Sequence, residues 1–254
     1  MSFLIAISGK GGVGKTTLSS LVVSRLIARG CQPVLAVDAD PNTCLDSALG
    51  VKAEKSIGRV REEAREESKK GLAAGVSKQE MLELKISESL VEAKDFDLIA
   101  MGRPEGPGCY CYANNVLKEA IGKISRHYPY VVLDNEAGLE NLSRRIVQKV
   151  NLLIMVADAS RSGLDTLSRL QALAREMAIK YDRLAIVVNR IRRPEMAREL
   201  ALLKAELKAD FLVCIPDDDE LALQAEQGWP LSRLPAANPV VAKVDALLAD
   251  VLGN

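Results

Sequence analysis

Short runs of apolar residues alternate with longer stretches of helical period along most of the chain. Continuous apolar runs of this length are typical of strands that are covered on both faces. Because strands and helices alternate, the pattern predicts an α/β fold with a doubly wound, mostly parallel sheet and helices on both faces. The predicted strands are residues 3–8, 33–38, 96–102, 130–134, 152–158, 184–189 and 211–215, and the predicted helices are residues 16–29, 115–127, 163–180 and 194–208.

The interval from Ala53 to Lys94 interrupts this alternation. It contains the segment VREEAREESKK and other dense charges of both signs at helical spacing, and it has no strand candidate. This pattern predicts a helical insertion at 53–94 made of exposed helices with ion pairs, although a docking surface for another protein would have the same pattern. The chain shows no repeat, linker or low-complexity tract, so residues 1–254 are interpreted as a single domain.

Composition narrows the classes of function. The 254 residues are 48% hydrophobic, which is ample for a buried core. Lys and Arg together number 34, as do Asp and Glu, so the overall positive charge of a general nucleic-acid binder is absent. Apolar runs are only strand-length, and the C-terminal segment PVVAKVDALLADVLGN is less basic than a membrane-surface helix. We therefore expect a cytoplasmic protein with no nucleic-acid or membrane partner.

A glycine-rich loop follows the first predicted strand. Residues 9–16, GKGGVGKT, fit G-x-x-x-x-G-K-[ST] between a predicted strand and a predicted helix, which is the context that a phosphate-binding loop requires. Its backbone N–H groups and the helix N-terminus would hold the phosphates, Lys15 would bridge the β- and γ-phosphates, and Thr16 would coordinate Mg²⁺. The nucleotide-binding residues predicted in this loop are Gly11, Gly12, Val13, Gly14, Lys15, Thr16 and Thr17.

Lys10 adds a second, earlier lysine to the loop. The form GKGGVGKTT resembles that of the deviant Walker A ATPases, the class that contains nitrogenase iron protein and the septum-positioning, chromosome-partitioning and metal-cofactor-assembly ATPases. The resemblance implies a homodimer that encloses two ATP molecules, with Lys10 reaching across the interface to the partner's nucleotide as a catalytic residue.

Two acidic stretches match the same class in the same order. By resemblance, Asp40 of VDADP orients or deprotonates the attacking water, and Asp38 supports the Mg²⁺ shell. The strand ending VVLD resembles a Walker B strand in which Asp134 holds Mg²⁺ through water, and residues 135–138, NEAG, follow as switch II. Either stretch alone would be an ordinary strand-end carboxylate, so their order behind the phosphate loop supports the functional interpretation.

The base-binding residues are also implied by resemblance. Asn189 ends the predicted strand 184–189 and is similar to the family asparagine that contacts the adenine edge. Pro216 and Asp217 resemble the loop that closes over the ring. The family is ATP-specific, and the guanine-reading motif NKxD does not occur in the chain.

Cys109 and Cys111 flank a single tyrosine in EGPGCYCYANN, directly after the predicted strand 96–102. One intervening residue is too few for a comfortable disulfide, and the following predicted helix would lower the pKa of both thiols. A C-x-C pair alone is a weak signal, but two copies at a dimer surface would offer four thiolates, a ligand set for Zn²⁺ or Ni²⁺. Cys31 and Cys214 are interpreted as packing residues.

A closer resemblance bears on the metal. GRPEGPGCYC together with GKGGVGKTT, VDADPN and LDNEAG is similar to the nickel-insertion accessory ATPases of carbon monoxide dehydrogenase and acetyl-CoA synthase maturation. That family implies an ATP-gated dimer that binds nickel at its C-x-C and delivers it to an apo-metalloenzyme client.

Two alternatives remain at this stage. The first is an iron–sulfur electron donor resembling nitrogenase iron protein, although residues 135–145 lack the second cysteine that the relative carries after Walker B. The second is a partition-type ATPase with a redox-sensitive loop.

Overall fold

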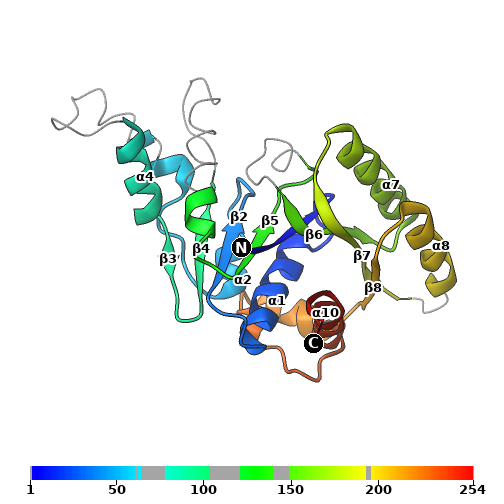
Figure 1. Ribbon diagram of the computed structural model, residues 1–254. Coiled ribbons are helices and arrows are strands. Elements are labelled where there is room, and N and C mark those ends of the chain that lie inside the picture. The colour runs from blue at the N-terminus through cyan, green and yellow to red at the C-terminus, as the bar shows by residue number, and fades with distance from the viewer. Residues whose placement is uncertain are drawn as a thin grey trace.

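The computed structural model describes residues 2–60, 62–63, 78–102, 121–139, 149–192 and 196–253. These residues form an eight-stranded sheet in the order β3-β4-β2-β5-β1-β6-β7-β8 (Figure 1). Every neighbouring pair is parallel except β3 with β4. The strands are β1 (Phe3–Gly9), β2 (Val34–Asp38), β3 (Val91–Glu92), β4 (Phe96–Ala100), β5 (Tyr130–Asp134), β6 (Val150–Asp158), β7 (Tyr181–Ile191) and β8 (Phe211–Pro216).

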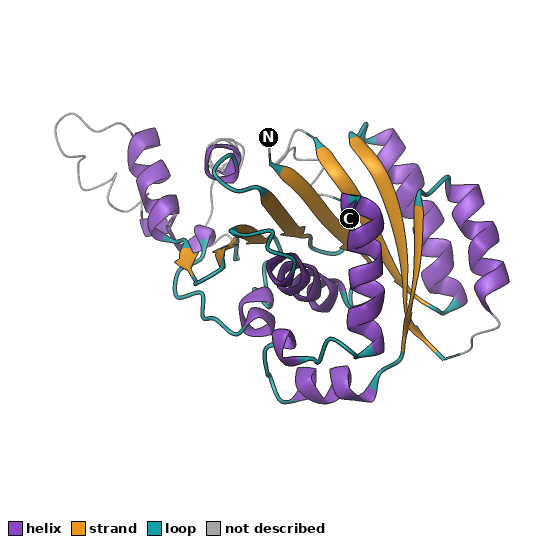
Figure 2. Ribbon diagram, turned by 60° about the horizontal axis from the view of Figure 1, so that its bottom comes forward, coloured by secondary structure: helices purple, strands orange, loops and turns teal. Residues whose placement is uncertain are grey.

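Helices cover both faces of the sheet, as Figure 2 shows. Successive β1 residues enter opposite cores: Ile5 packs with apolar residues of α1 and α10, and Leu4 packs with residues of α4, α7 and α8. Strands covered in this way must be apolar along their whole length, which explains the continuous runs in the sequence. The helices are α1 (Lys15–Ala28), α2 (Leu45–Leu49), α4 (Lys78–Glu88), α7 (Arg161–Glu176), α8 (Ala197–Leu207), α9 (Asp219–Glu226), η2 (Leu231–Arg233) and α10 (Pro239–Leu252).

The expected fold class is confirmed, with one correction in the interval 53–94. That interval contains β3, whose Val91 and Glu92 pair antiparallel with Leu98 and Asp97 of β4. Two residues are too few to give an alternating or continuous apolar pattern, so this strand has no sequence signal. Its antiparallel direction also explains why the sheet is mostly, and not wholly, parallel.

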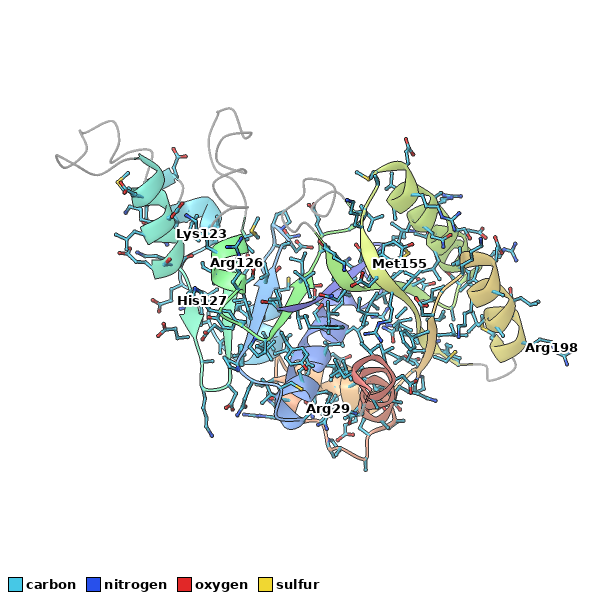
Figure 3. The ribbon with its side chains drawn as sticks, in the orientation of Figure 1. Arg29, Lys123, Arg126, His127, Met155 and Arg198 are labelled. Atoms are coloured by element: carbon cyan, nitrogen blue, oxygen red, sulfur yellow. The ribbon has the colours of Figure 1, made fainter. Side chains whose placement is uncertain are left out.

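The charged interval also contributes to the core. Ile86 of α4 is fully buried, so the expectation of purely exposed helices is too simple. The helix also carries an ion pair of the expected kind, because Lys123, labelled in Figure 3, donates to Glu83 of α4 at 2.7 Å at a partly exposed position. An ion pair of this exposure adds only about 0–1 kcal/mol, so the buried isoleucine contributes more to holding α4 in place.

The strand order brings the carboxyl ends of β2, β5 and β1 together. Asp134 of β5 lies in register with Ile7 of β1 on one side and with Asp38 of β2 on the other. Because β1 continues directly into the glycine-rich loop, both aspartates end beside that loop. This is the edge at which open α/β sheets bind ligands.

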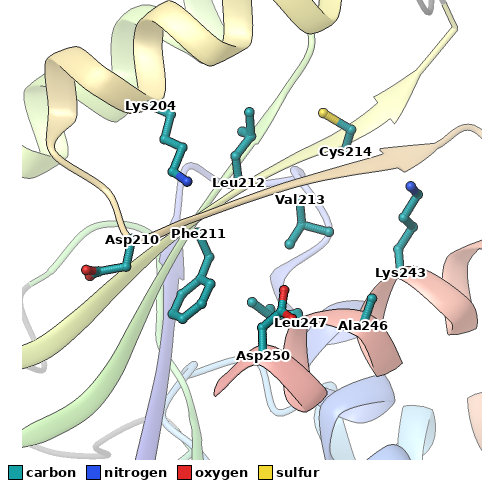
Figure 4. A pocket seen from close by; sticks show the side chains of 10 residues that line it. All are labelled: Lys204, Asp210, Phe211, Leu212, Val213, Cys214, Lys243, Ala246, Leu247 and Asp250. Atoms are coloured by element: carbon teal, nitrogen blue, oxygen red, sulfur yellow. The ribbon is translucent and has the colours of Figure 1, made fainter. Parts of the chain in front are cut away.

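A separate hollow of about 560 Å³ lies at the outer edge of the sheet, along β8 and between α8 and α10 (Figure 4). Its lining includes Lys204, Phe211, Cys214 and Lys243 and no residue of the glycine-rich loop. Burial raises the pKa of the Cys214 thiol, which suits a packing residue better than a metal ligand.

None of the helices in the described part of the chain is long and apolar enough to cross a membrane.

Candidate nucleotide-binding site

The glycine-rich loop joins β1 to α1 and has the conformation that its glycines permit. Gly12 and Gly14 have φ values of +79° and +96°, and Gly14 is the residue that precedes α1. A Cβ atom on Gly14 would lie 2.5 Å from Nδ2 of Asn189, so any other residue here would displace that amide and would also strain the backbone. Lys15 is 7% exposed, and its Nζ donates to the carbonyl of Lys10 at 3.1 Å. The loop therefore presents backbone N–H groups and one buried ammonium around the helix N-terminus.

A cavity of about 470 Å³ opens above this loop. Most of the residues predicted for the phosphate site line it, and so does Asp40 from the loop after β2. Asn42, the last residue of the VDADPN stretch, and Arg190 also line it, and no motif in the sequence points to Arg190. The lining residues are Gly11, Gly12, Gly14, Lys15, Thr16, Thr17, Asp40, Asn42, Glu136, Ala137 and Arg190.

Asp38 organises the loop that follows β2. Its side chain is fully buried, and it accepts hydrogen bonds from the backbone N–H groups of Asp40, Cys44 and Leu45 at 2.9–3.0 Å. Burial raises the pKa of this carboxyl, and the three backbone donors oppose that shift. Asp40 in turn accepts from the backbone and side-chain N–H groups of Asn42, in a local turn at the mouth of the cavity. The Asp38 carboxylate thus sets the position of Asp40.

Asp134 is buried at the end of β5, beside the phosphate loop. One carboxylate oxygen accepts from the Ser19 hydroxyl at 3.0 Å, and the other, Oδ2, is buried without a hydrogen-bond partner. Burial raises the pKa of Asp134 to about 7, and the nearby Asp38 charge adds to the rise, whereas the Thr16 and Ser19 hydroxyls and the Lys15 charge oppose it. Two carboxylates and a threonine hydroxyl beside a phosphate loop form an oxygen donor set that can hold Mg²⁺ and its waters.

The raised pKa of Asp134 predicts an unusual pH dependence in protein freed of Mg²⁺ and nucleotide. A folded-state pKa of about 7 against 3.8 means that the folded state binds the proton more tightly. The resulting stability is fully present below about pH 4 and is lost as the pH rises through 7. Between pH 5 and pH 8 the free energy of unfolding should fall by about 2–3 kcal/mol from this group. Asp134→Asn should remove this fall in denaturant titrations at both pH values; an unchanged fall would contradict the assignment.

Residues 135–138 are fastened to the start of the phosphate loop. The Ser8 hydroxyl donates to the Gly138 carbonyl at 2.5 Å, and the Gly138 N–H donates to the Gly9 carbonyl at 3.2 Å. Glu136 and Ala137, between β5 and these bonds, line the cavity. Two hydrogen bonds therefore join this segment to the end of β1, from which the phosphate loop begins.

The residues predicted to bind the base lie around the end of β7. Asn189 is 8% exposed, its Nδ2 donates to the Val13 carbonyl at 2.9 Å, and its Oδ1 accepts from the Arg190 N–H. The Asn189 amide is therefore used within the protein, as a brace for the phosphate loop. Asp217 accepts from Arg192 at 2.7 Å, and its N–H donates to the Ile191 carbonyl. Asn189, Pro216 and Asp217 lie outside the lining of the phosphate cavity.

The predicted metal ligands Cys109 and Cys111 fall in residues 103–120, outside the described part of the chain. The described residues on either side place the start of that segment after β4, at the same edge of the sheet as the phosphate loop. Among the described residues no group of three or more His, Cys, Asp or Glu side chains could hold a metal ion.

Comparisons with known proteins agree with this geometry. Residues 2–185 match the family model AAA_31, described as an AAA domain. The chain is 40% identical to an uncharacterized ATP-binding protein of Methanocaldococcus jannaschii, over 99% of both chains. It is 30% identical to carbon monoxide dehydrogenase accessory protein CooC of Rhodospirillum rubrum, over 98% of this chain and 95% of the relative.

Solved structures show the same fold at lower identity. A ParA family ATPase from Chlorobium tepidum superimposes with a TM-score of 0.72 at 16% identity, over the full length of both chains. The MinD cell division protein of Aquifex aeolicus does so with a TM-score of 0.68 at 22% identity, over 98% of this chain and 97% of that one. The chain belongs to the AAA_31 family and is a P-loop ATPase, with the fold that is seen in the solved MinD and ParA family structures.

Proposed function

We propose that this ATPase is a metallochaperone that binds nickel at Cys109 and Cys111 and inserts it into an apo-metalloenzyme of the carbon monoxide dehydrogenase or acetyl-CoA synthase type. Two facts support the proposal: the C-x-C pair in the sequence, and the 30% identity over nearly the whole chain to an accessory protein of carbon monoxide dehydrogenase. In this proposal two chains form a homodimer, and each contributes two thiolates to one shared ion.

The ATPase machinery has separate tasks for its residues. Lys15 and the backbone of the phosphate loop bind the triphosphate, and Asp40 positions the attacking water. Thr16, Asp38 and Asp134 would hold Mg²⁺, which would supply positive charge beside the phosphates. Lys10 acts on the nucleotide of the partner chain, and Asn189, Pro216 and Asp217 surround the base. The orphaned oxygen of Asp134 is the observation that best fits a cation in this place.

The backbone of Met101 connects the nucleotide site with the segment that contains the two cysteines. The Met101 N–H donates to the carbonyl of Asp38 at 2.8 Å, and the Met101 carbonyl accepts from the Gly58 N–H at 2.9 Å. The chain therefore enters residues 103–120 from a point bonded to the same residue whose carboxylate positions Asp40. A shift at the end of β2 on ATP binding or hydrolysis would move the entry to the cysteine segment with it. We propose this as the path by which nucleotide state changes metal affinity.

Transfer of nickel tests this function. Protein loaded with Ni²⁺ should activate nickel-free carbon monoxide dehydrogenase faster with ATP than with a non-hydrolysable analogue, because hydrolysis reopens the dimer. Lys10→Ala protein, loaded with the same amount of Ni²⁺, should lose the ATP-dependent part of this activation. In light scattering, the analogue should also fail to tighten the dimer of this variant. Equal activation with and without ATP would contradict the proposal, and iron and sulfide in the purified protein would favour the electron donor instead.

A further inference from the structure

Arg190 sits at an irregularity in β7. The parallel pairing of β7 with β8 runs in register to Val188, shifts, and resumes at Ile191. Within this shift Arg190 has a φ of +57°, in the left-handed region that non-glycine residues rarely adopt. Bulges beside a binding site commonly serve to re-aim a side chain, and strained backbone persists where the surrounding structure holds it.

The strained conformation is held by the phosphate loop itself. The Arg190 N–H donates to Oδ1 of Asn189 at 2.9 Å, and Nδ2 of the same amide donates to the Val13 carbonyl at 2.9 Å. One buried amide therefore joins the backbone of Arg190 to the phosphate loop. Because Gly14 has no Cβ, this amide can approach the backbone of the phosphate loop closely.

The side chain that the bulge presents is a cation at the phosphate cavity. Arg190 lines the cavity together with Lys15 and the glycines of the loop. Asp158, at the end of β6, has its pKa lowered first by hydrogen bonds from Ser160 and further by the charges of Lys10 and Arg190. Arg190 and Lys10 therefore share one charged neighbourhood above the loop.

We propose that Arg190 is a nucleotide-binding residue whose guanidinium contacts the phosphates of ATP, and that the strained bulge in β7 exists to aim it there. Arginine suits this role because its planar fork donates several hydrogen bonds to phosphate oxygens. The residue would add a third cation to the site, after Lys15 and the Lys10 of the partner. Neither the phosphate-loop motif nor the strand pattern identifies it.

Replacement of Arg190 by glycine should raise the stability of the protein and lower its affinity for the nucleotide. Arg190→Gly relieves the left-handed backbone and removes the cation, so the nucleotide-free protein should melt about 1–3 °C higher. Its affinity for ADP and for inorganic tripolyphosphate should fall about tenfold or more, the loss expected for a charge-assisted hydrogen bond. Arg190→Lys should bind both ligands more tightly than Arg190→Gly does. It should melt at the wild-type temperature, because it keeps a side chain on the left-handed backbone.

Lys208 provides a matched control. It is an exposed cation with a φ of +52° at the end of α8, outside the phosphate cavity. Lys208→Gly should raise the melting temperature by a similar amount and leave both affinities unchanged. Calorimetric titration with ADP and with tripolyphosphate, combined with thermal melts without ligand, measures all of these quantities.

Three results would overturn the proposal. Wild-type affinity of Arg190→Gly for both ligands would remove Arg190 from the site. A loss of ADP affinity with unchanged tripolyphosphate affinity would move its contact to the ribose or the base. A lower melting temperature for Arg190→Gly, with a higher one for Lys208→Gly, would show that the backbone at Arg190 is not strained. The bulge would then not be a costly device that aims the guanidinium. Arg190→Asn, which tolerates this backbone, keeps the binding test valid in that case.

Discussion

Lys15→Ala should abolish most ATP turnover, because it removes the one buried ammonium of the phosphate cavity. Asp40→Asn should lower turnover by about 10²–10⁴-fold, the usual contribution of a residue that positions or deprotonates a reacting group. The two variants should differ in binding. Asp40→Asn keeps the phosphate loop intact and should still bind a non-hydrolysable ATP analogue, whereas Lys15→Ala should bind it weakly. Steady-state phosphate release and equilibrium binding separate the two effects.

Asp46→Asn is a suitable control for Asp40→Asn. Asp46 lies in α2, a few residues further along, and accepts from the N–H groups of Ser47 and Ala53, outside the lining of the cavity. Its replacement should leave turnover near the wild-type rate. Turnover near the wild-type rate in Lys15→Ala or Asp40→Asn would instead mean that the catalytic site is assigned to the wrong residues.

Cys109→Ser and Cys111→Ser should each weaken nickel binding by orders of magnitude. Each substitution removes two of the four thiolates from every dimer, and a serine hydroxyl does not replace a thiolate ligand at neutral pH. Nickel binding to the wild type should release protons from thiols that are still protonated. ATP turnover without metal should survive both substitutions, because the phosphate loop is a separate group of residues.

Two of the three remaining cysteines, Cys31 and Cys214, serve as controls for this experiment. Cys214 lines the hollow along β8, and Cys31 packs against the core that contains α1, so neither belongs to the nucleotide site. Cys214→Ala and Cys31→Ala should keep wild-type nickel affinity. A comparable loss in either control would point to unfolding, and not to ligand removal, as the cause.

The parts of the fold that sequence could predict are those with a long, regular signal. Strands buried on both faces must be apolar throughout, so β6 and β7 are visible as continuous runs, and the glycine-rich loop has a fixed spacing between strand and helix. β3 could not be predicted, because a strand of two residues is too short to show an apolar pattern. Ile86 is missed for another reason: one buried residue in a charged helix gives no detectable period.

The hydrogen bonds, pKa values and positions of individual side chains depend on residues that are distant in the sequence and meet only in the folded protein. The sequence gives no sign that the side chain of Asn189 donates a hydrogen bond to the Val13 carbonyl, which is 176 positions away in the chain. The pKa of Asp134 reflects its burial and its register with Asp38 on another strand. No sequence motif identifies Arg190 as a residue of the cavity, because its position results from a bulge in the pairing of β7 with β8. Each of these features requires tertiary structure.

The most direct test of the account is a nickel titration of the purified protein with and without a non-hydrolysable ATP analogue. We predict one Ni²⁺ per two chains, and a nickel affinity that changes when the nucleotide is bound, because in the proposed homodimer each chain contributes Cys109 and Cys111 to one shared ion. One Ni²⁺ per chain with an affinity that ignores nucleotide would contradict it, as would wild-type affinity in the double variant Cys109→Ser, Cys111→Ser.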